Sequence, residues 1–243
     1  MRVIFDLDDT LYLERDFARS GFAAAGAWLD KEFGVGGLAR TCQALFDTGR
    51  RTHIFDEALG LLGMTADPAL VELLVVIYRT HEPTIALATD AARYLASLPG
   101  GFRAGLITDG PHATQQAKVR ALGLDQVLEF IVYTDALGVG YGKPHPRAFA
   151  LVEAWAAPDL ELVYVADNPL KDFVTPRSRG WWTVQLDRPE RANRFAAPDH
   201  THEAHARIAS LDELEACLDR VRSDSRLVVA AGDWRASALG AAL

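Results

Sequence analysis

The chain has 243 residues, of which 49% are hydrophobic, and a formal net charge of -8 with a pI of about 5.4. This length suffices for one large domain or a core domain with an insert, and the apolar content excludes wholesale disorder. An acidic surface repels phosphate backbones, so we expect no nucleic-acid partner. Two cysteines far apart, no fitting signal peptide and no long apolar run predict a cytoplasmic protein without membrane contact.

The first predicted element is a short buried strand, Val3 to Phe5, which stops at Asp6. Residues 14–82 then read as wholly helical, and Asp67-Pro68 has the N-cap carboxylate and first-turn proline of a helix start. From about residue 88 onward, strand and helix patterns alternate. The expected helices are 91–98, 111–122, 146–156, one starting at Pro169 and 211–221; the expected strands are 104–107, 130–133, 162–166 and 181–186.

This alternation predicts an α/β fold with a Rossmann-like, mostly parallel sheet and helices on both faces. Residues 1–13 and 83–221 would form the catalytic core, and residues 14–82 an inserted all-helical cap. The polar stretch 187–204 is predicted to be a loop. Residues 222–243 show no pattern and are treated as a C-terminal tail.

Three predicted strands end on polar residues, namely on Asp6, on Thr108-Asp109 and on Asp167. Ligands of open parallel sheets bind beyond the carboxyl ends of the strands, so these residues should meet at one crevice. Asp6 and Asp167 could share Mg²⁺, which takes oxygen ligands, and Lys143 would add a compact positive charge. Positioning and electrostatics of this kind are what phosphoryl transfer requires, with an aspartyl phosphate as the intermediate.

Four segments, in order, resemble the motifs of the haloacid dehalogenase superfamily: residues 6–12 (DLDDTLY), 107–110 (ITDG), 142–146 (GKPHP) and 165–172 (VADNPLKD). The resemblance covers about residues 1 to 221, and the helical insert is similar to the cap of subfamily I. Ala166 departs from the usual glycine, a small change that concerns only local loop geometry.

The resemblance implies catalytic roles for four residues. Asp6 would be the nucleophile and Asp8 the general acid and base, while Thr108 and Lys143 would hold the phosphoryl group. Thr108 could also cap a helix, and Lys143 could be an ordinary surface lysine, although a lysine here is unusual in a chain that prefers arginine.

The resemblance also implies a magnesium site at Asp6, Asp8, Asp167 and Asp172, and substrate contacts at Asp109 and Gly110. For Asp172 the alternative is an acidic residue in the first turn of a helix, where the helix dipole favours it.

The predicted cap would close over the substrate and supply specificity from its inner face. The candidates are Arg51, His53, Arg79 and His81, and Arg79 is favoured because it follows a buried helix near the hinge. The alternative is a charged helix surface. A separate group, His200, His202 and His205, invites a zinc interpretation, but no complete ligand set is present and solvated side chains explain it more simply.

The predicted activity is Mg²⁺-dependent hydrolysis of a small-molecule phosphate monoester, by a monomer or homodimer. The main alternative is a phosphomutase acting on a sugar phosphate. A dehalogenase is disfavoured because it needs neither Asp8 nor Mg²⁺. A non-catalytic receiver-like module is disfavoured by the large helical insert and by the order of the acidic residues. The default substrate, by analogy, is a phosphorylated sugar or similar metabolite.

Overall fold

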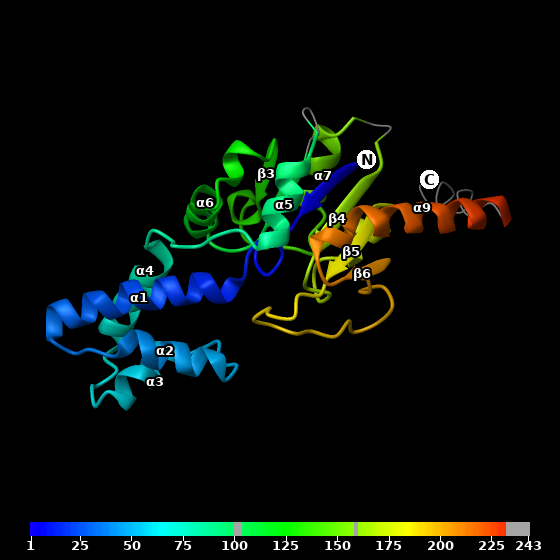
Figure 1. Ribbon diagram of the computed structural model, residues 1–243. Helices are drawn as coiled ribbons and strands as arrows, with labels where there is room; N and C mark the ends of the chain where they lie inside the picture. The colour runs from blue at the N-terminus through cyan, green and yellow to red at the C-terminus, as the bar shows by residue number, and fades with distance from the viewer. Residues whose placement is uncertain (100–103, 158–159, 232–243) are drawn as a thin grey trace.

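A parallel sheet forms the centre of the molecule in the computed structural model, which describes residues 1–99, 104–157 and 160–231 (Figure 1). Its strand order is β3-β2-β1-β4-β5-β6. The strands are β1 (Arg2–Phe5), β2 (Gly105–Thr108), β3 (Phe130–Tyr133), β4 (Leu162–Ala166), β5 (Trp182–Leu186) and β6 (Ala206–Ile208). The chain adds strands on one side of β1 and then returns to the other, which makes the β1–β4 boundary a topological switch point. The predicted α/β fold is confirmed.

Helices cover both faces of the sheet. Along β1, Val3 and Phe5 join one apolar core and Ile4 joins the other, as the alternation of strand side chains requires. The first face packs against α5 (Thr89–Ser97), α6 (His112–Ala121) and α9 (Leu214–Ala231), and the second against α7 (Arg147–Trp155) and the segment around α8 (Val174–Ser178).

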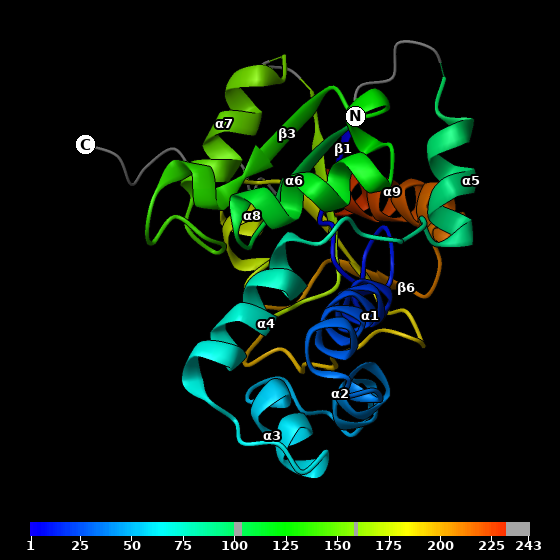
Figure 2. The same ribbon diagram turned by 90° about the vertical axis from the view of Figure 1, so that its left-hand side faces the viewer.

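The inserted segment contains α1 (Glu14–Phe33), α2 (Leu38–Asp47), α3 (Ile54–Leu61) and α4 (Pro68–Thr80). These helices lie together at one side of the sheet (Figure 2) and have an apolar core of their own around Phe22, Leu29 and Leu74. Gly21 permits close packing of α1 on α4, because a Cβ there would lie 2.5 Å from the ring of Tyr78. We call α1 to α4 the cap; the predicted domain boundaries remain a prediction.

The structure differs from the local predictions in three places. No helix starts at Pro169, because residues 168–172 form a turn. The Asn168 N–H donates to the Asp172 carboxylate across this turn at 3.1 Å. Helix α8 begins only at Val174. Strand β6 was missed; it is short and sits at the sheet edge. Helix α9 continues to Ala231, well into the predicted tail, and residues 232–243 of that tail lie outside the described part of the chain.

Within the described ranges, none of the helices combines the length and apolar character needed to cross a bilayer. Cys42 and Cys217 are buried free thiols in different cores, Cys42 in the cap and Cys217 under the sheet.

Candidate active site

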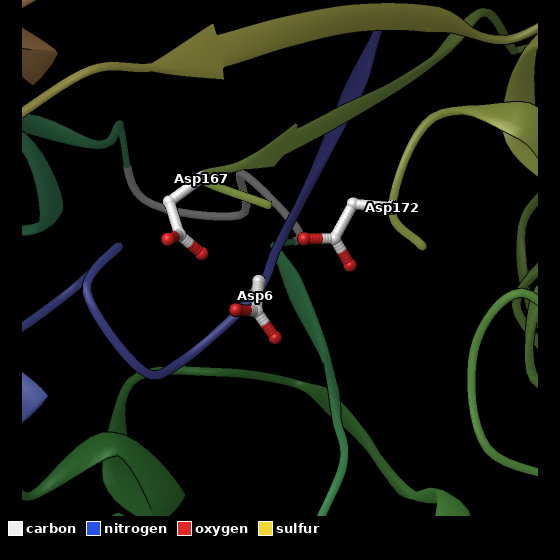
Figure 3. Close-up of side chains that lie close together, drawn as sticks. All are labelled: Asp6, Asp167 and Asp172. Carbon is white, nitrogen blue, oxygen red and sulfur yellow. The ribbon is translucent and has the colours of Figure 1, made fainter. Parts of the chain in front are cut away.

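Three acidic side chains meet at the carboxyl ends of the central strands. Asp6 directly follows β1, Asp167 directly follows β4, and Asp172 lies in the turn after β4. Their carboxylates lie close together, and one oxygen from each lies within 4.8 Å of the others (Figure 3). All three side chains are buried. The strand ends therefore bring together a compact set of hard oxygen donors.

Lys143 is the buried cation of this cluster. Its Nζ lies 2.6 Å from Asp6 Oδ1 and 2.7 Å from Asp172 Oδ1, and it donates to the Tyr164 hydroxyl at 2.9 Å. Burial alone would lower the pKa of Lys143, but Asp172 and Asp6 raise it well above its ordinary value. The ammonium is therefore charged wherever the protein is folded near neutral pH.

One buried ammonium does not balance the three carboxylates. Burial raises the pKa of Asp6 to about 6, against the opposing effect of Lys143. Burial and the neighbouring charges of Asp6 and Asp172 raise the pKa of Asp167 to about 9. Burial is the main cause of both shifts, and at Asp167 the neighbouring carboxylates add to it. Buried carboxylates that need positive charge fit a divalent cation of the Mg²⁺ type.

Asp8 points away from that cluster and has donors of its own. Lys118 Nζ lies 2.6 Å from Asp8 Oδ1, Gln115 Nε2 donates to Oδ2 at 2.9 Å, and the Tyr12 hydroxyl donates to Oδ1. Burial would raise the pKa of Asp8, but the Lys118 charge and these hydrogen bonds lower it. The structure thus separates the Asp8 carboxylate from the proposed metal ligands.

The second motif lines the crevice opposite Asp6. Thr108 is fully buried, and its hydroxyl accepts a hydrogen bond from Gln115. Asp109 accepts from Lys171 Nζ at 2.9 Å and from the Lys143 N–H at 3.1 Å; these two lysines lower its pKa against the effect of burial. Gly110 lines the crevice and has φ +122, a conformation that favours glycine; a Cβ there would lie 3.3 Å from the Gln115 side chain.

The crevice opens into a cavity of about 470 Å³. Most of its lining consists of residues that directly follow the strand ends. The rest comes from the cap and from the loop after β5, which together contribute Glu14, Arg51, Asn193 and Phe195. The cavity is therefore enclosed by segments that lie far apart in the sequence.

Arg51 joins the cap to that loop. Its Nε donates to Asn193 Oδ1 at 2.9 Å and one terminal nitrogen donates to the Ala192 carbonyl at 2.6 Å. The other terminal nitrogen donates to the carbonyls of Phe46 and Arg50, both at 2.8 Å, so four of the five guanidinium N–H groups are engaged within the protein. Arg51 is the predicted cap candidate that lines the cavity.

The other cap candidates lie elsewhere. Arg79 is exposed on α4, outside the cavity lining, and its carbonyl accepts from Thr114 Oγ1 at 3.0 Å. His53 is exposed and sits beside a smaller hollow within the cap. His81 packs on Phe17, with its ring bonded to Ser20 and to the Tyr78 carbonyl. The helix that carries Arg79 turns that side chain away from the crevice.

The histidines of the loop after β5 do not converge. His205 Nδ1 lies 2.8 Å from the Thr183 hydroxyl, and His202 Nδ1 lies 2.9 Å from Asp199. His200 is exposed. Among the described residues, the one acidic or histidine group close enough to hold a metal is the triad of Asp6, Asp167 and Asp172.

Several residues of the site had no place in the sequence-based predictions, among them Gln115, Lys118, Lys171 and Asn193. Gln115 and Lys118 lie three positions apart on α6, and this spacing, which puts both on one helix face after the second motif, could have revealed them. Lys171 lies inside the fourth motif. Asn193 lies in a loop and carries no signal in the sequence, because only the tertiary fold brings it to the cavity.

Relatives of known activity share most of this chain. The model of the haloacid dehalogenase-like hydrolase family matches residues 1–172. A glyceraldehyde 3-phosphate phosphatase of Methanopyrus kandleri is 30% identical over an alignment of 199 residues, which covers 76% of this chain and 83% of the relative. Another of that name, from Pyrococcus furiosus, is 26% identical over an alignment of 242 residues, which covers 95% of this chain and 98% of the relative. The predicted family resemblance is confirmed.

Solved structures share the fold. A hydrolase of Deinococcus radiodurans R1, solved with bound phosphate and sodium, has a TM-score of 0.60 at 21% identity, covering 90% of this chain and 95% of that one. An L-2-haloacid dehalogenase of Xanthobacter autotrophicus has a TM-score of 0.59 at 19% identity, covering 90% and 98%. At this level of identity they support the architecture alone.

Proposed function

The chain is a phosphatase of the haloacid dehalogenase-like hydrolases, and from this premise we propose that it hydrolyses a small sugar phosphate through a covalent intermediate on Asp6. The observation that carries the proposal is the placement of the buried Asp6 carboxylate between Lys143 and two further carboxylates. The names of the relatives support a triose phosphate as the substrate, with glyceraldehyde 3-phosphate as the first compound to test.

In the first half-reaction an Asp6 oxygen attacks phosphorus, and the bond from phosphorus to the ester oxygen breaks. The leaving oxygen takes a proton from Asp8, acting as general acid. Lys143 offsets negative charge beside Asp6. The Thr108 hydroxyl would donate to a phosphoryl oxygen. These contacts stabilise the charge that develops on the transferring group.

In the second half-reaction water attacks the aspartyl phosphate and gives its proton to Asp8, which releases inorganic phosphate and restores Asp6. The lowered pKa of Asp8 favours the carboxylate that this step needs as a base. In the first step, the dianionic phosphate entering near Asp8 would raise that pKa and favour the protonated acid.

The residues present fit a magnesium ion. Asp6, Asp167 and Asp172 would hold it, since their oxygens are buried, close together and short of positive charge. When bound, the ion would offset the repulsion between the Asp6 carboxylate and the phosphate dianion. The Asp8 side chain, predicted as a fourth ligand, is engaged by Lys118 instead.

The proposal is tested by measuring phosphate release from glyceraldehyde 3-phosphate with Mg²⁺ present. Asp6→Asn replaces the nucleophile with an amide of equal size, so turnover should fall by at least about 1,000-fold with the fold intact. Asp125→Asn, an exposed position distant from the cavity, is the matched control. Formation of an isomeric phosphate ester, with no release of inorganic phosphate, would indicate a phosphomutase instead. Turnover by the Asp6→Asn protein would contradict the covalent mechanism.

A further inference from the structure

The cavity has an inner end for the phosphoryl group and an outer end for the rest of the substrate. The outer end is bounded by Glu14, Asn193, Arg51 and Phe195. Whatever alcohol leaves the phosphate must lie against these side chains, so their chemistry determines which alcohol is accepted.

Glu14 and Asn193 are joined across the outer end. Asn193 Nδ2 donates to Glu14 Oε2 at 2.9 Å, and Asn193 Oδ1 accepts from Arg51. Asp9 holds the two segments that carry this pair. Its carboxylate accepts from the backbone N–H of Glu14 and from that of Ala192, the residue before Asn193, each at 2.9 Å. The pair is therefore held in place before any substrate arrives.

The outer end offers little positive charge to a second anion. The Arg51 guanidinium is nearest, but most of its N–H groups already donate within the protein. Glu14 and Asp9 add negative charge, and burial together with Asp8 raises the pKa of Glu14 to about 7. The charges of Asp8 and Asp9 contribute to that rise, so a further negative charge close to Glu14 is unfavourable.

We infer that Glu14 and Asn193 form a specificity pair, which accepts an uncharged leaving group bearing hydroxyls and rejects esters that carry a second anionic group. Carboxylate and amide side chains supply both acceptors and donors for hydroxyl groups. A carboxylate on the leaving group would face Glu14, while the two cations of the described cavity lining, Arg51 and Lys171, already donate within the protein. This inference rests on the proposed phosphatase function and narrows its substrate class.

A matched pair of esters tests the inference. Glyceraldehyde 3-phosphate and 3-phosphoglycerate share a carbon skeleton. The first carries an aldehyde where the second carries a carboxylate. Binding is measured by calorimetry with Mg²⁺ on the Asp6→Asn protein. The aldehyde should bind roughly tenfold more tightly than the acid, the effect of about one unit charge a few ångströms away.

Adding Glu14→Gln to Asp6→Asn should narrow this preference to less than about threefold, mainly through tighter binding of the acid. Glu72→Gln, the same change at an exposed position of α4, should leave it unaltered. Asn193→Ala should weaken binding of the aldehyde by roughly two- to tenfold, the range of a lost hydrogen bond.

Equal binding of the two esters, or a preference that Glu14→Gln does not change, would overturn the inference. If the Glu14→Gln protein does not fold, the Asn193→Ala variant tests the inference instead. An unchanged affinity of that variant for glyceraldehyde 3-phosphate would overturn the inference. These binding results are independent of turnover. A wild-type protein that releases no phosphate would contradict the proposed function while the binding preference still tests the specificity pair.

Discussion

Asp8 illustrates how a single carboxylate is held by groups from several elements. Lys118 and Gln115 reach it from α6, and Tyr12 reaches it from the loop after β1. Lys118 is itself buried, with its ammonium 4.4 Å from the centre of the Phe17 ring. A buried ammonium paired with one carboxylate orients that carboxylate, because moving either charge would leave the other unpaired.

Replacing Lys118 with methionine should therefore impair the proton transfers of Asp8. We expect kcat for glyceraldehyde 3-phosphate to fall by roughly tenfold or more, and kcat for p-nitrophenyl phosphate to fall much less, since an aryl oxide leaves without protonation. Steady-state kinetics on both esters measure the difference. Lys31→Met removes an exposed lysine and is the control. Equal slowing of the two esters would show that Lys118 supports the fold only.

At the scale of elements, one buried ion pair joins segments that surround the site. Arg188, just after β5, donates to both carboxylate oxygens of Asp90 at 2.8 and 2.9 Å and to the Thr10 carbonyl. Asp90, at the start of α5, also accepts from the Leu211 N–H at 2.7 Å. The pair thus connects α5, the loop after β5 and the loop that follows Asp6.

Removing the arginine would leave Asp90 buried without its cation. Arg188→Met should lower the free energy of unfolding by about 3–5 kcal/mol, measured by urea denaturation. Arg93→Met removes the exposed partner of Asp212 and should lower the free energy of unfolding far less. A loss for Arg188→Met no larger than that for Arg93→Met would contradict this account.

The same pair predicts a direction for acid denaturation. Burial would raise the pKa of Asp90, but the hydrogen bonds from Arg188 and Leu211 lower it. A carboxyl whose pKa is lowered by folding stabilises the protein above its unfolded pKa, near 3.9, and loses that contribution as the pH falls toward the folded value. The Arg188→Met loss should therefore be largest near neutral pH and shrink below about pH 4.

At the scale of the whole molecule, the cavity is built by three parts of the chain. The strand ends carry the acidic cluster, the cap supplies Glu14 and Arg51, and the loop after β5 supplies Asn193. The acidic cluster of Asp6, Asp167 and Asp172 places three buried carboxylates close together, at the carboxyl ends of β1 and β4. A cation bound there would favour the folded state, since the unfolded chain has no such cluster.

Magnesium should therefore raise the melting temperature of the protein. At a free concentration about 100 times its dissociation constant the stabilisation is about 2.7 kcal/mol, or roughly 5–10 °C for a chain of this size. Asp167→Asn should remove most of the shift, and Asp125→Asn, at an exposed position, should not. Scanning calorimetry with and without a chelator measures it; an Asp167→Asn protein that keeps the full shift would refute the assignment.

The sequence by itself determined the α/β class and the strands that end on Asp6, Thr108 and Asp167. Those features are local, because apolar runs, periodicity and the motif residues are written in consecutive positions. The helical character of the insert followed from the same local patterns, including the helix start at Asp67, whose carboxylate accepts from the N–H groups of Ala69 and Leu70.

Only the tertiary structure decided which side chains complete the cavity. Lys118 pairs with Asp8 across 110 positions of sequence, and Asn193 meets Glu14 across 179. Such contacts depend on how α6 and the loop after β5 pack on the sheet, which no local pattern encodes. Arg79 shows the converse, since its place near the hinge favoured a substrate contact, yet on α4 it is exposed and lies outside the cavity lining. Arg51, in the segment between α2 and α3, lines the cavity instead.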